Sequence, residues 1–318
     1  DIAYFDSENK NQILQTPIPE STGFAFRTQN VGTITQEGVE ISLNAEVLRV
    51  GDFSWNTIVN FSHVESTVEE LVEGTDRIVI ASAFNSVQLV AVPGKEFQLF
   101  GFDYARDEAT GRPLIDPTNG RRIAGEQTLF GSVFPDYTMG FLNTFSYKGL
   151  QLTATIDYSS GGKIRSATVE GLWDGGYTVE TAQNREGTYI DTEGLIQNDD
   201  GTTRPNDVPV RSSYDFWETF SDASVSQATI FDATYVKLRE IGVSYTLPKR
   251  MFANNFIESL QVGIEGRNLA LLYTKVPHID PEANLFGSGS ASGRDGFGIE
   301  RNVVPSVRGL GFNVRLTF

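Results

Sequence analysis

Long runs in which apolar and polar residues alternate dominate this sequence. Two such runs span residues 137–148 and 150–160, and the second begins as soon as the first ends. A period of two is that of a β-strand. A strand of about ten residues, rising about 3.3 Å per residue and tilted at roughly 45°, climbs about 24 Å, close to the apolar band of an outer-membrane barrel. Length and period together predict strands that cross a lipid layer. The apolar positions are Tyr137, Met139, Phe141, Phe145, Tyr147, Leu150, Leu152, Ala154, Ile156 and Tyr158.

The same alternation recurs elsewhere in the chain. Residues 39–47 and 53–62 flank Gly51-Asp52, and an Asx/Gly pair between two alternating runs indicates a hairpin. Residues 260–265 and 310–318 alternate too, and the last residue, Phe318, falls on the apolar parity. We therefore expect an all-β, antiparallel sheet with one apolar face.

The lengths of the connections carry a second signal. Short links at 51–52, 148–149 and 248–258 take turns with long ones at 6–36, 161–232 and 273–305. Up-and-down outer-membrane barrels have short periplasmic turns and long extracellular loops, whereas a soluble sandwich has little reason to sort its loops in this way. Residues 67–136 fit the pattern less well. Their extended stretches predict an extra hairpin or a structured outer loop, namely 77–81, 87–92 and 97–104.

Two details depart from strict alternation. In residues 233–248, Val236 and Leu238 share one parity, but Ile241 and the apolar residues after it occupy the other. A one-residue bulge near Arg239-Glu240 would return all of them to one face, and we predict it. In the run 137–148, Asn143 is a polar residue on the apolar parity, which the alternation does not explain.

Composition excludes several classes of protein. The net charge of −16 disfavours nucleic acid and anionic lipid surfaces as partners. With no cysteine, the chain has no disulfide, thiolate metal site or cysteine nucleophile. No stretch approaches the roughly 18 consecutive apolar residues of a membrane-spanning helix. The chain opens without an initiating Met or a targeting pattern, so we expect it to be a mature or internal portion of something longer.

Catalytic and metal-binding chemistry finds little support. His63 and His278 lie in unrelated segments, and carboxylates are too abundant for any chosen pair to carry meaning. Residues 107–120 faintly suggest an oxygen-rich cation loop, but the spacing does not match an EF-hand and a turn-rich hairpin is favoured. For Asp280-Pro281-Glu282 with Asn284, a loop-stabilising role is favoured over a metal site. We expect no enzyme activity, no metal and no cofactor.

Aromatic residues in 161–232 are candidate contacts for a ligand or partner. Exposed rings there would stack on sugars or pack against another protein. The alternative is that they form the small core of the loop itself. The candidates are Trp173, Tyr177, Tyr214, Phe216 and Trp217.

Residues 233–248 (ATYVKLREIGVSYTLP) resemble a signature stretch of the SusC/RagA family of TonB-linked outer-membrane proteins. Residues 266–270 (GRNLA) and 280–282 (DPE) follow in the order typical of that family, and 309–318 (GLGFNVRLTF) is similar to its closing strand. Earlier stretches are similar too, namely residues 30–32, 37–40 and 143–149.

The resemblance implies a transmembrane, antiparallel up-and-down β-barrel of about 22 strands with long extracellular loops. Residues 1–318 would be the carboxyl-terminal part of this one barrel domain, with the plug and the amino-terminal domains outside the chain. Such proteins reside in the outer membrane of Gram-negative-type bacteria and carry a SusD-like surface lipoprotein as a lid. TonB drives their import of oligosaccharide or peptide fragments, here through a segment that would precede Asp1.

A partial sheet cannot sit alone in a bilayer, because each unpaired backbone group in hydrocarbon costs several kcal/mol. We therefore expect the strand ending at Phe318, the assembly terminus of the barrel, to pair with an early strand outside this sequence. Closure of residues 306–318 onto residues 1–50 would contradict this. Hydrated side chains should face the lumen and tune selectivity: Glu265, Arg267, Asn313 and Arg315.

Two other interpretations stay open. The same barrel would serve as a structural, non-transporting subunit of a larger outer-membrane assembly if the plug and TonB-contact segments were lost. A secreted β-sandwich active on glycans would instead be soluble without detergent.

Overall fold

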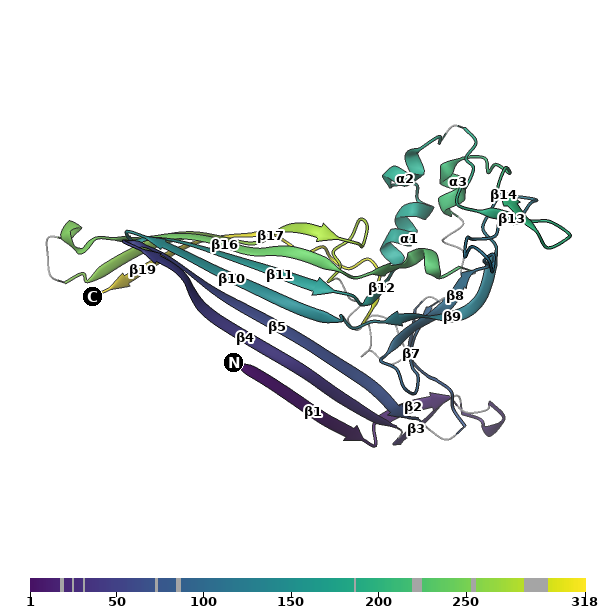
Figure 1. Cartoon of the computed structure of the whole chain (residues 1–318), viewed down its shortest axis with the longest axis horizontal. Helices are drawn as coiled ribbons and strands as arrows, with labels where there is room; N and C mark the ends of the chain where they lie inside the picture. The colour runs from purple at the N-terminus through teal and green to yellow at the C-terminus, as the bar shows by residue number, and fades with distance from the viewer. Residues whose placement is uncertain are drawn as a thin grey trace.

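The computed structural model describes residues 1–17, 20–24, 26–30, 32–71, 74–83, 87–185, 187–218, 225–252, 256–282 and 297–318. Its main feature is an eight-stranded antiparallel sheet, here called the wall, in the order β1-β4-β5-β10-β11-β16-β17-β19 (Figure 1). The strands are β1 (Ile2–Lys10), β4 (Thr33–Val50), β5 (Phe53–Glu70), β10 (Tyr137–Tyr147), β11 (Leu150–Ser160), β16 (Tyr235–Leu247), β17 (Ser259–Thr274) and β19 (Gly309–Thr317).

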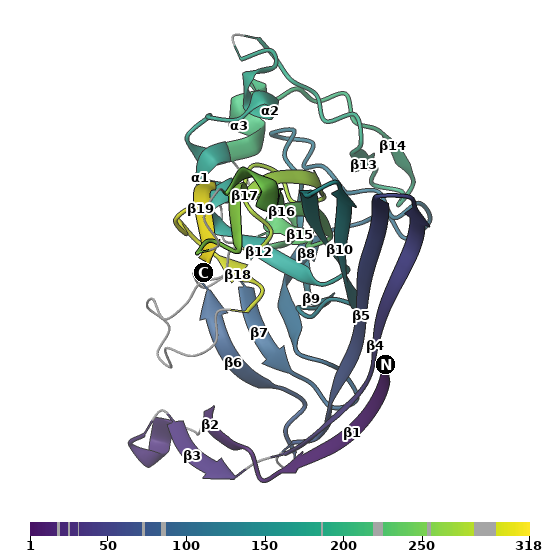
Figure 2. The same cartoon turned by 90° about the vertical axis from the view of Figure 1, so that its left-hand side faces the viewer.

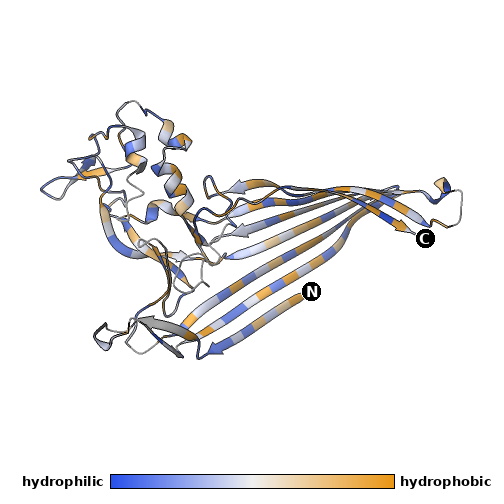
Figure 3. Cartoon of the chain, turned by 180° about the vertical axis from the view of Figure 1, so that it is seen from behind, coloured by the Kyte–Doolittle hydropathy of each residue, from blue (hydrophilic) through white to orange (hydrophobic). Residues whose placement is uncertain are grey.

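The register of the wall gathers its apolar residues on one face. One row runs Leu43, Val59, Phe141 and Ile156 across four neighbouring strands. A second row, Ala154, Ile241, Gly266 and Leu310, continues across the rest. The alternation shows as blue and orange bands along each strand (Figure 3). The predicted antiparallel sheet with one apolar face is confirmed.

The predicted bulge is present in β16. On β11, Thr155 and Ile156 are consecutive, yet their partners on β16 are Glu240 and Leu238, so Arg239 is the extra residue. Leu238 and Ile241 then lie opposite Ile156 and Ala154 on the apolar face. Without the bulge, the change of parity would place the apolar residues of half of the strand on the polar face.

Asn143 now has a structural explanation. Its side-chain oxygen accepts a hydrogen bond of 3.0 Å from the indole N–H of Trp55 on the neighbouring strand. Trp55 also stacks on Phe145, with ring centroids 5.6 Å apart. In an apolar environment the indole N–H of Trp55 would lack an acceptor, and the Asn143 side chain supplies one.

The two ends of the wall differ. The tight turns at 51–52 and 148–149 lie at one end, and the long connections fold at the other (Figure 1). Residues predicted as an extra hairpin or structured loop form a four-stranded antiparallel sheet of β6 (Ile78–Ala83), β7 (Val87–Ala91), β8 (Gln98–Tyr104) and β9 (Ala124–Ser132). Seen along the strands, this sheet lies within the arc of the wall (Figure 2).

The remaining connections carry short elements. The first contains β2 (Ile13–Pro17), η1 (Glu20–Thr22) and β3 (Phe26–Asn30). The next contains β12 (Lys163–Ser166), α1 (Ala167–Asp174), α2 (Val179–Ala182), β13 (Leu195–Gln197), β14 (Thr203–Pro205), α3 (Ser213–Glu218), η3 (Gln227–Thr229) and β15 (Ile230–Asp232). The link from β16 to β17 holds η4 (Lys249–Met251), and β18 (Ile299–Glu300) joins β12 in parallel. No helix among the described residues has the length and apolarity to span a membrane.

Buried apolar residues are concentrated outside the wall. One cluster centres on Val87, Leu89, Leu99 and Ile299, and a second gathers around Phe216. Both lie in what is here called the outer region, the described residues between 71 and 136, 161 and 234, and 275 and 308. The wall has no comparable core of its own, and Leu310 and Phe312 are 90% and 71% exposed.

The wall is an open arc (Figure 2). Its outermost strands are β1 and β19, which do not pair with each other in the part of the chain that the structure describes. The contradicting arrangement, in which residues 306–318 close onto residues 1–50, is therefore absent there. Pairing of the terminal strand with a segment outside this sequence stays a prediction. Phe318 stacks on Phe256 at the turn end, with centroids 5.6 Å apart and planes 8° from parallel.

Candidate functional site

The polar face of the wall carries the side chains predicted to be lumenal. Glu265 lies opposite Gly242, Asn313 opposite Gly263 and Arg315 opposite Gln261, all on the parity opposite to the apolar rows. Arg267 binds Glu265 at 2.7 Å and lies 3.7 Å from Glu240. A shallow cavity of about 200 Å³ opens between these strands, and Glu265 and Asn313 are part of its lining. Exposure of these four side chains to the lumen of a closed barrel stays a prediction.

An ion-pair network lies at the start of β16, where the chain enters the wall. The ammonium of Lys237 binds both carboxylate oxygens of Asp280, at 2.6 and 2.8 Å, and also binds Glu282. Arg239 joins Asp157 of β11 at 2.5 Å to Glu282 at 2.7 Å. The phenol of Tyr235 donates to Glu282 at 2.8 Å. Residues 280–282 are thereby tied to the wall.

Burial makes this network costly to break. The Lys237 side chain is only 3% exposed, and a buried cation that loses its partner is strongly destabilising. The bulge contributes because Arg239, the extra residue, reaches Asp157 and Glu282 on the side where Lys237 lies. The loop-stabilising role favoured for Asp280 and Glu282 is thus confirmed by their contacts.

The same contacts set the acidity of the two carboxyls. Burial alone would raise the pKa of Glu282, but hydrogen bonds from Arg239, Lys237 and Tyr235 outweigh it and hold the pKa at about 2. Burial likewise opposes ionisation of Asp280, and hydrogen bonds from Lys237 and Ser306 keep its pKa below the ordinary value. Both groups are anions at neutral pH.

A second polar cluster fixes α1 in the outer region. Glu300 of β18 is 1% exposed and accepts hydrogen bonds from Thr168 and, at 2.5 Å, from Ser166. Ser166 also caps α1 by accepting from the Val169 amide at 3.0 Å. The neighbouring Arg165, 1% exposed, pairs with Glu170. The Glu300 contacts join segments that are more than 130 residues apart, so no local pattern indicated them.

The five aromatic candidates divide into two groups. Trp173 and Phe216 are 5% and 2% exposed and belong to the second apolar cluster, with Trp217 packed against it. The rings of Trp173 and Trp217 lie 4.7 Å apart. These three residues fit the alternative interpretation, a core of the loop itself. Tyr177 is 81% exposed and stays a candidate contact, while the Tyr214 hydroxyl donates to the Asp174 carbonyl at 2.9 Å.

The favoured turn-rich hairpin in residues 107–120 is confirmed. The Asp107 carboxylate accepts from the amide and hydroxyl of Thr110, at 2.9 and 2.5 Å, and Asp116 does the same with Thr118, at 2.7 and 2.6 Å. Among the described residues, no group of three or more His, Asp or Glu side chains has a geometry that would hold a metal ion. Asn284 and the Gly/Ser-rich stretch 287–293 lie outside the described residues.

The two histidines are far from any shared site. His63 Nδ1 lies 2.5 Å from the Asp136 carbonyl, and His278 Nε2 lies 3.1 Å from Glu180 of α2. They contact different elements and share no carboxylate.

A protein-family model matches most of the chain. The sequence model described as TonB dependent receptor-like, beta-barrel, matches residues 1–269. TonB-dependent receptor P3 of Formosa agariphila is 23% identical over 99% of this chain and 32% of its own length. TonB-dependent receptor SusC of Bacteroides thetaiotaomicron is 25% identical over 44% of this chain and 15% of its own length.

Solved structures agree on the fold. The RagAB peptide transporter superimposes with a TM-score of 0.69 at 20% identity, covering 100% of this chain and 33% of the other. The RagAB peptide importer in its open-open state gives a TM-score of 0.70 at 18% identity, with 100% and 32% covered. The chain therefore spans about a third of the length of receptor P3 and of the RagAB chain that it matches.

Proposed function

This chain belongs to the TonB-dependent receptor-like β-barrel family, and on that premise we propose that it forms part of an outer-membrane importer. It supplies a stretch of barrel wall and several outer loops, and the remainder of the barrel completes the sheet. The cargo is an oligosaccharide or peptide fragment, captured under a SusD-like lipoprotein lid and moved inward with energy from TonB. Receptors of this family are not enzymes, and binding with gated passage suffices for the mechanism.

One observation carries the proposal, namely an apolar face that continues across all eight strands without a second layer over it. Leu310, Phe312 and Ile264 are 90%, 71% and 61% exposed. In water such a surface would aggregate, whereas in lipid it is the required exterior. The opposite face carries charged and amide side chains, as the water-filled interior of a barrel does.

The edges of the arc support a partner from the same barrel. The backbone groups on the outer sides of β1 and β19 have no partner strand in the part of the chain that the structure describes. Open edges do not occur in hydrocarbon, so further strands must continue the sheet on both sides. We propose that those strands, with a plug and a TonB-contacting segment, lie outside residues 1–318.

Two features support capture at the outer end. The long connections lie at the end of the wall opposite the tight turns (Figure 1). The network of Lys237 and Arg239 ties residues 280–282 to the wall beneath them. The RagAB neighbours are a peptide transporter and a peptide importer, which supports the peptide class of cargo, and the oligosaccharide class is kept beside it in the proposal.

Uptake by cells tests the function. Bacteria with and without the gene receive dye-labelled maltohexaose, oligogalacturonate and peptides, with and without an uncoupler of the proton gradient. Gene-dependent uptake of one class that stops with the uncoupler is expected. Correct insertion in the outer membrane without uptake of any class would favour the structural-subunit interpretation. Recovery of a monodisperse protein without detergent would overturn both.

A further inference from the structure

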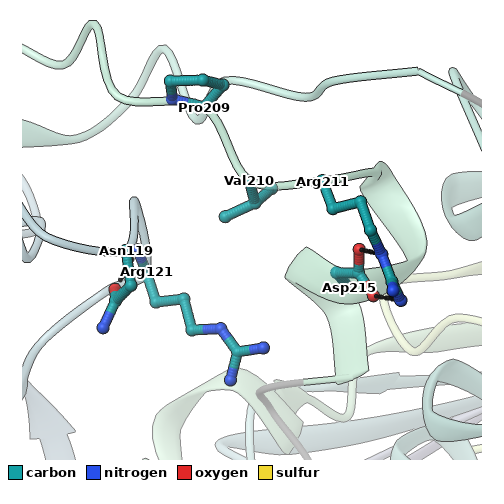
Figure 4. A pocket seen from close by; sticks show the side chains of 6 residues that line it. All are labelled: Asn119, Arg121, Pro209, Val210, Arg211 and Asp215. Carbon is teal, nitrogen blue, oxygen red and sulfur yellow. Dashed lines mark hydrogen bonds and ion pairs between the residues drawn. The ribbon is translucent and has the colours of Figure 1, made fainter.

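The outer region contains a cavity of about 520 Å³ between the turn-rich hairpin and α3. Its lining comprises Asn119, Arg121, Pro209, Val210, Arg211 and Asp215 (Figure 4). We propose that this cavity binds a carboxylate group on the cargo. The inference deepens the proposed function and rests on it for the import that follows capture.

The charges in the cavity favour an anion. Arg211 and Asp215 neutralise each other through two parallel hydrogen bonds of 2.7 and 2.6 Å. Arg121, by contrast, forms no ion pair within the described part of the chain, and its side chain extends across the cavity toward α3 (Figure 4). Among the described residues, the lining therefore holds two guanidinium groups and one carboxylate, a net positive charge, although Arg121 also attracts the Asp215 carboxylate electrostatically. This is notable in a chain whose net charge is −16.

Charges close to the cavity decide whether an anion binds there. The Debye length is about 8 Å at physiological ionic strength, so distant carboxylates of the acidic chain are largely screened. A guanidinium is also the cation best suited to a carboxylate, because its planar fork of donors matches both oxygens. The Asn119 side chain is engaged within the hairpin and is not the group that binds the anion. It already donates to Asp116 at 2.9 Å and accepts from the Arg121 amide at 2.9 Å.

The backbone holds Arg121 at this position. Gly120 has φ of +74°, and a Cβ placed on it would lie 2.8 Å from the Val208 carbonyl oxygen, so the hairpin presses against residues 208–210. That facing segment is fixed by two hydrogen bonds between Val210 and Tyr189, of 3.0 and 2.8 Å. The next residue, Arg122, binds Asp191 and Glu193 instead. Adjacent arginines thus have different tasks, one structural and one turned to the cavity.

Calorimetry on the full-length gene product in detergent tests the inference. The probes are trigalacturonate, an aspartate-rich hexapeptide and neutral maltotriose. We expect one or both acidic probes to bind more tightly than maltotriose. Arg121→Gln should weaken that binding about ten- to a hundredfold, the range for a lost charge-assisted bidentate contact. Binding of only one acidic probe identifies whether the carboxylate comes from a sugar acid or a peptide.

A variant of opposite sign makes the test sharper. Asp215→Asn removes the acid that the described residues contribute to the cavity lining, and with it the negative charge that would repel an anion, so the acidic probe should bind about three- to tenfold more tightly. Arg49→Gln is the matched control, since it deletes an arginine paired with Glu46 beside the turn at the far end of the wall. It should leave affinity unchanged.

Two outcomes would overturn the inference. One is equal binding of acidic and neutral probes. The other is an affinity that Arg121→Gln and Asp215→Asn both leave unchanged or both lower. The proposed function fails separately, through uptake assays in cells: binding with no import contradicts transport, and import of neutral cargo without anion binding contradicts only the cavity.

Discussion

The wall and the outer region bury their apolar residues in opposite ways. In the outer region, Val87 and Leu99 are 0% exposed and are packed between strands of the same chain. In the wall, Leu310 is 90% exposed and its neighbours on the apolar face have no protein layer over them. Two regions of one polypeptide are thus adapted to different solvents, water and lipid. The outer region folds as a water-soluble protein does, and the wall uses lipid in place of a core.

Removing a core ring from the outer region should have the largest effect. Phe216→Ala empties the centre of the second apolar cluster, and a buried Phe→Ala change costs about 3–5 kcal/mol. Hydrogen exchange should show loss of protection in α1 and α3 with the wall unchanged. Tyr177→Ala, at an 81% exposed position, is the control. Loss of protection throughout the wall would contradict the independence of the two regions.

A charge on the apolar face of the wall should come next. Ile264→Arg is expected to cost about 2–4 kcal/mol if it lies near the bilayer midplane, because the guanidinium would face hydrocarbon. Unfolding from detergent or lipid vesicles in urea measures this. Gln261→Arg, on the polar face of the same strand, should cost much less. Equal tolerance at both positions would mean that the apolar face does not contact lipid.

The ion-pair network joins the two regions, and its loss should have an intermediate effect. Glu282→Gln removes a partner of Lys237 and Arg239, for which the cost of an unsatisfied buried group is about 1–3 kcal/mol. Hydrogen exchange of the described residues 275–282 and 297–308 should rise. Glu108→Gln deletes the same charge from an exposed turn and serves as the control.

Acid should weaken the same joint. The pKa of Glu282 is lowered in the folded protein to about 2, from an ordinary value of 4.5. Its contribution is therefore fully present above pH 4.5 and is lost as the pH falls toward 2. Protection of residues 275–282 should decline across this window in the wild type and respond less steeply in Glu282→Gln. Identical slopes would show that another group controls the acid response.

The smallest effect is expected from the polar pair on the apolar face. Asn143→Leu leaves the Trp55 indole N–H without its acceptor, and hydrogen bonds between side chains in membranes average about 0.6 kcal/mol, with a maximum of about 1.7. Urea unfolding of Asn143→Leu, Trp55→Phe and the double variant completes a cycle. The double variant should be more stable than the sum of the single changes predicts. Strict additivity would mean that the hydrogen bond contributes nothing.

Sequence predicted the wall far better than the outer region, for a physical reason. The runs 137–148 and 150–160 became β10 and β11 almost without change, and even the bulge at Arg239 followed from parity, because each strand repeats its face locally. The runs 39–47 and 53–62 were correct in type but too short, since β4 and β5 extend to Thr33 and Glu70. Strand ends beyond the lipid band carry no alternation signal.

The contacts of the candidate site are mostly non-local and left only a partial signal. Asp280-Pro281-Glu282 was marked as loop-stabilising, but its partners Lys237 and Arg239 lie more than 40 residues away. Residues 233–248 and 280–282 both carried the family resemblance, but nothing in the sequence paired them. The contact of Glu300 with Ser166, 134 residues apart, was equally unpredicted. The burial of Trp173 and Phe216 was equally invisible, because aromatic residues look the same whether they form a core or a contact surface.

The length of β4 and β5 determines how far the molecule extends beyond the membrane. Each has 18 residues, which at about 3.4 Å per residue and a tilt of roughly 45° climb about 43 Å, well above the about 25 Å of oil that such a protein spans. On the lipid side, the row Tyr4–Val39–His63 is followed by Asp6, Glu37 and Glu65, which lie opposite one another. Ionised carboxylates are not stable among acyl chains, so these three residues mark the outer limit of the lipid band. The strands are therefore held at a fixed depth and place the outer region above the lipid headgroups.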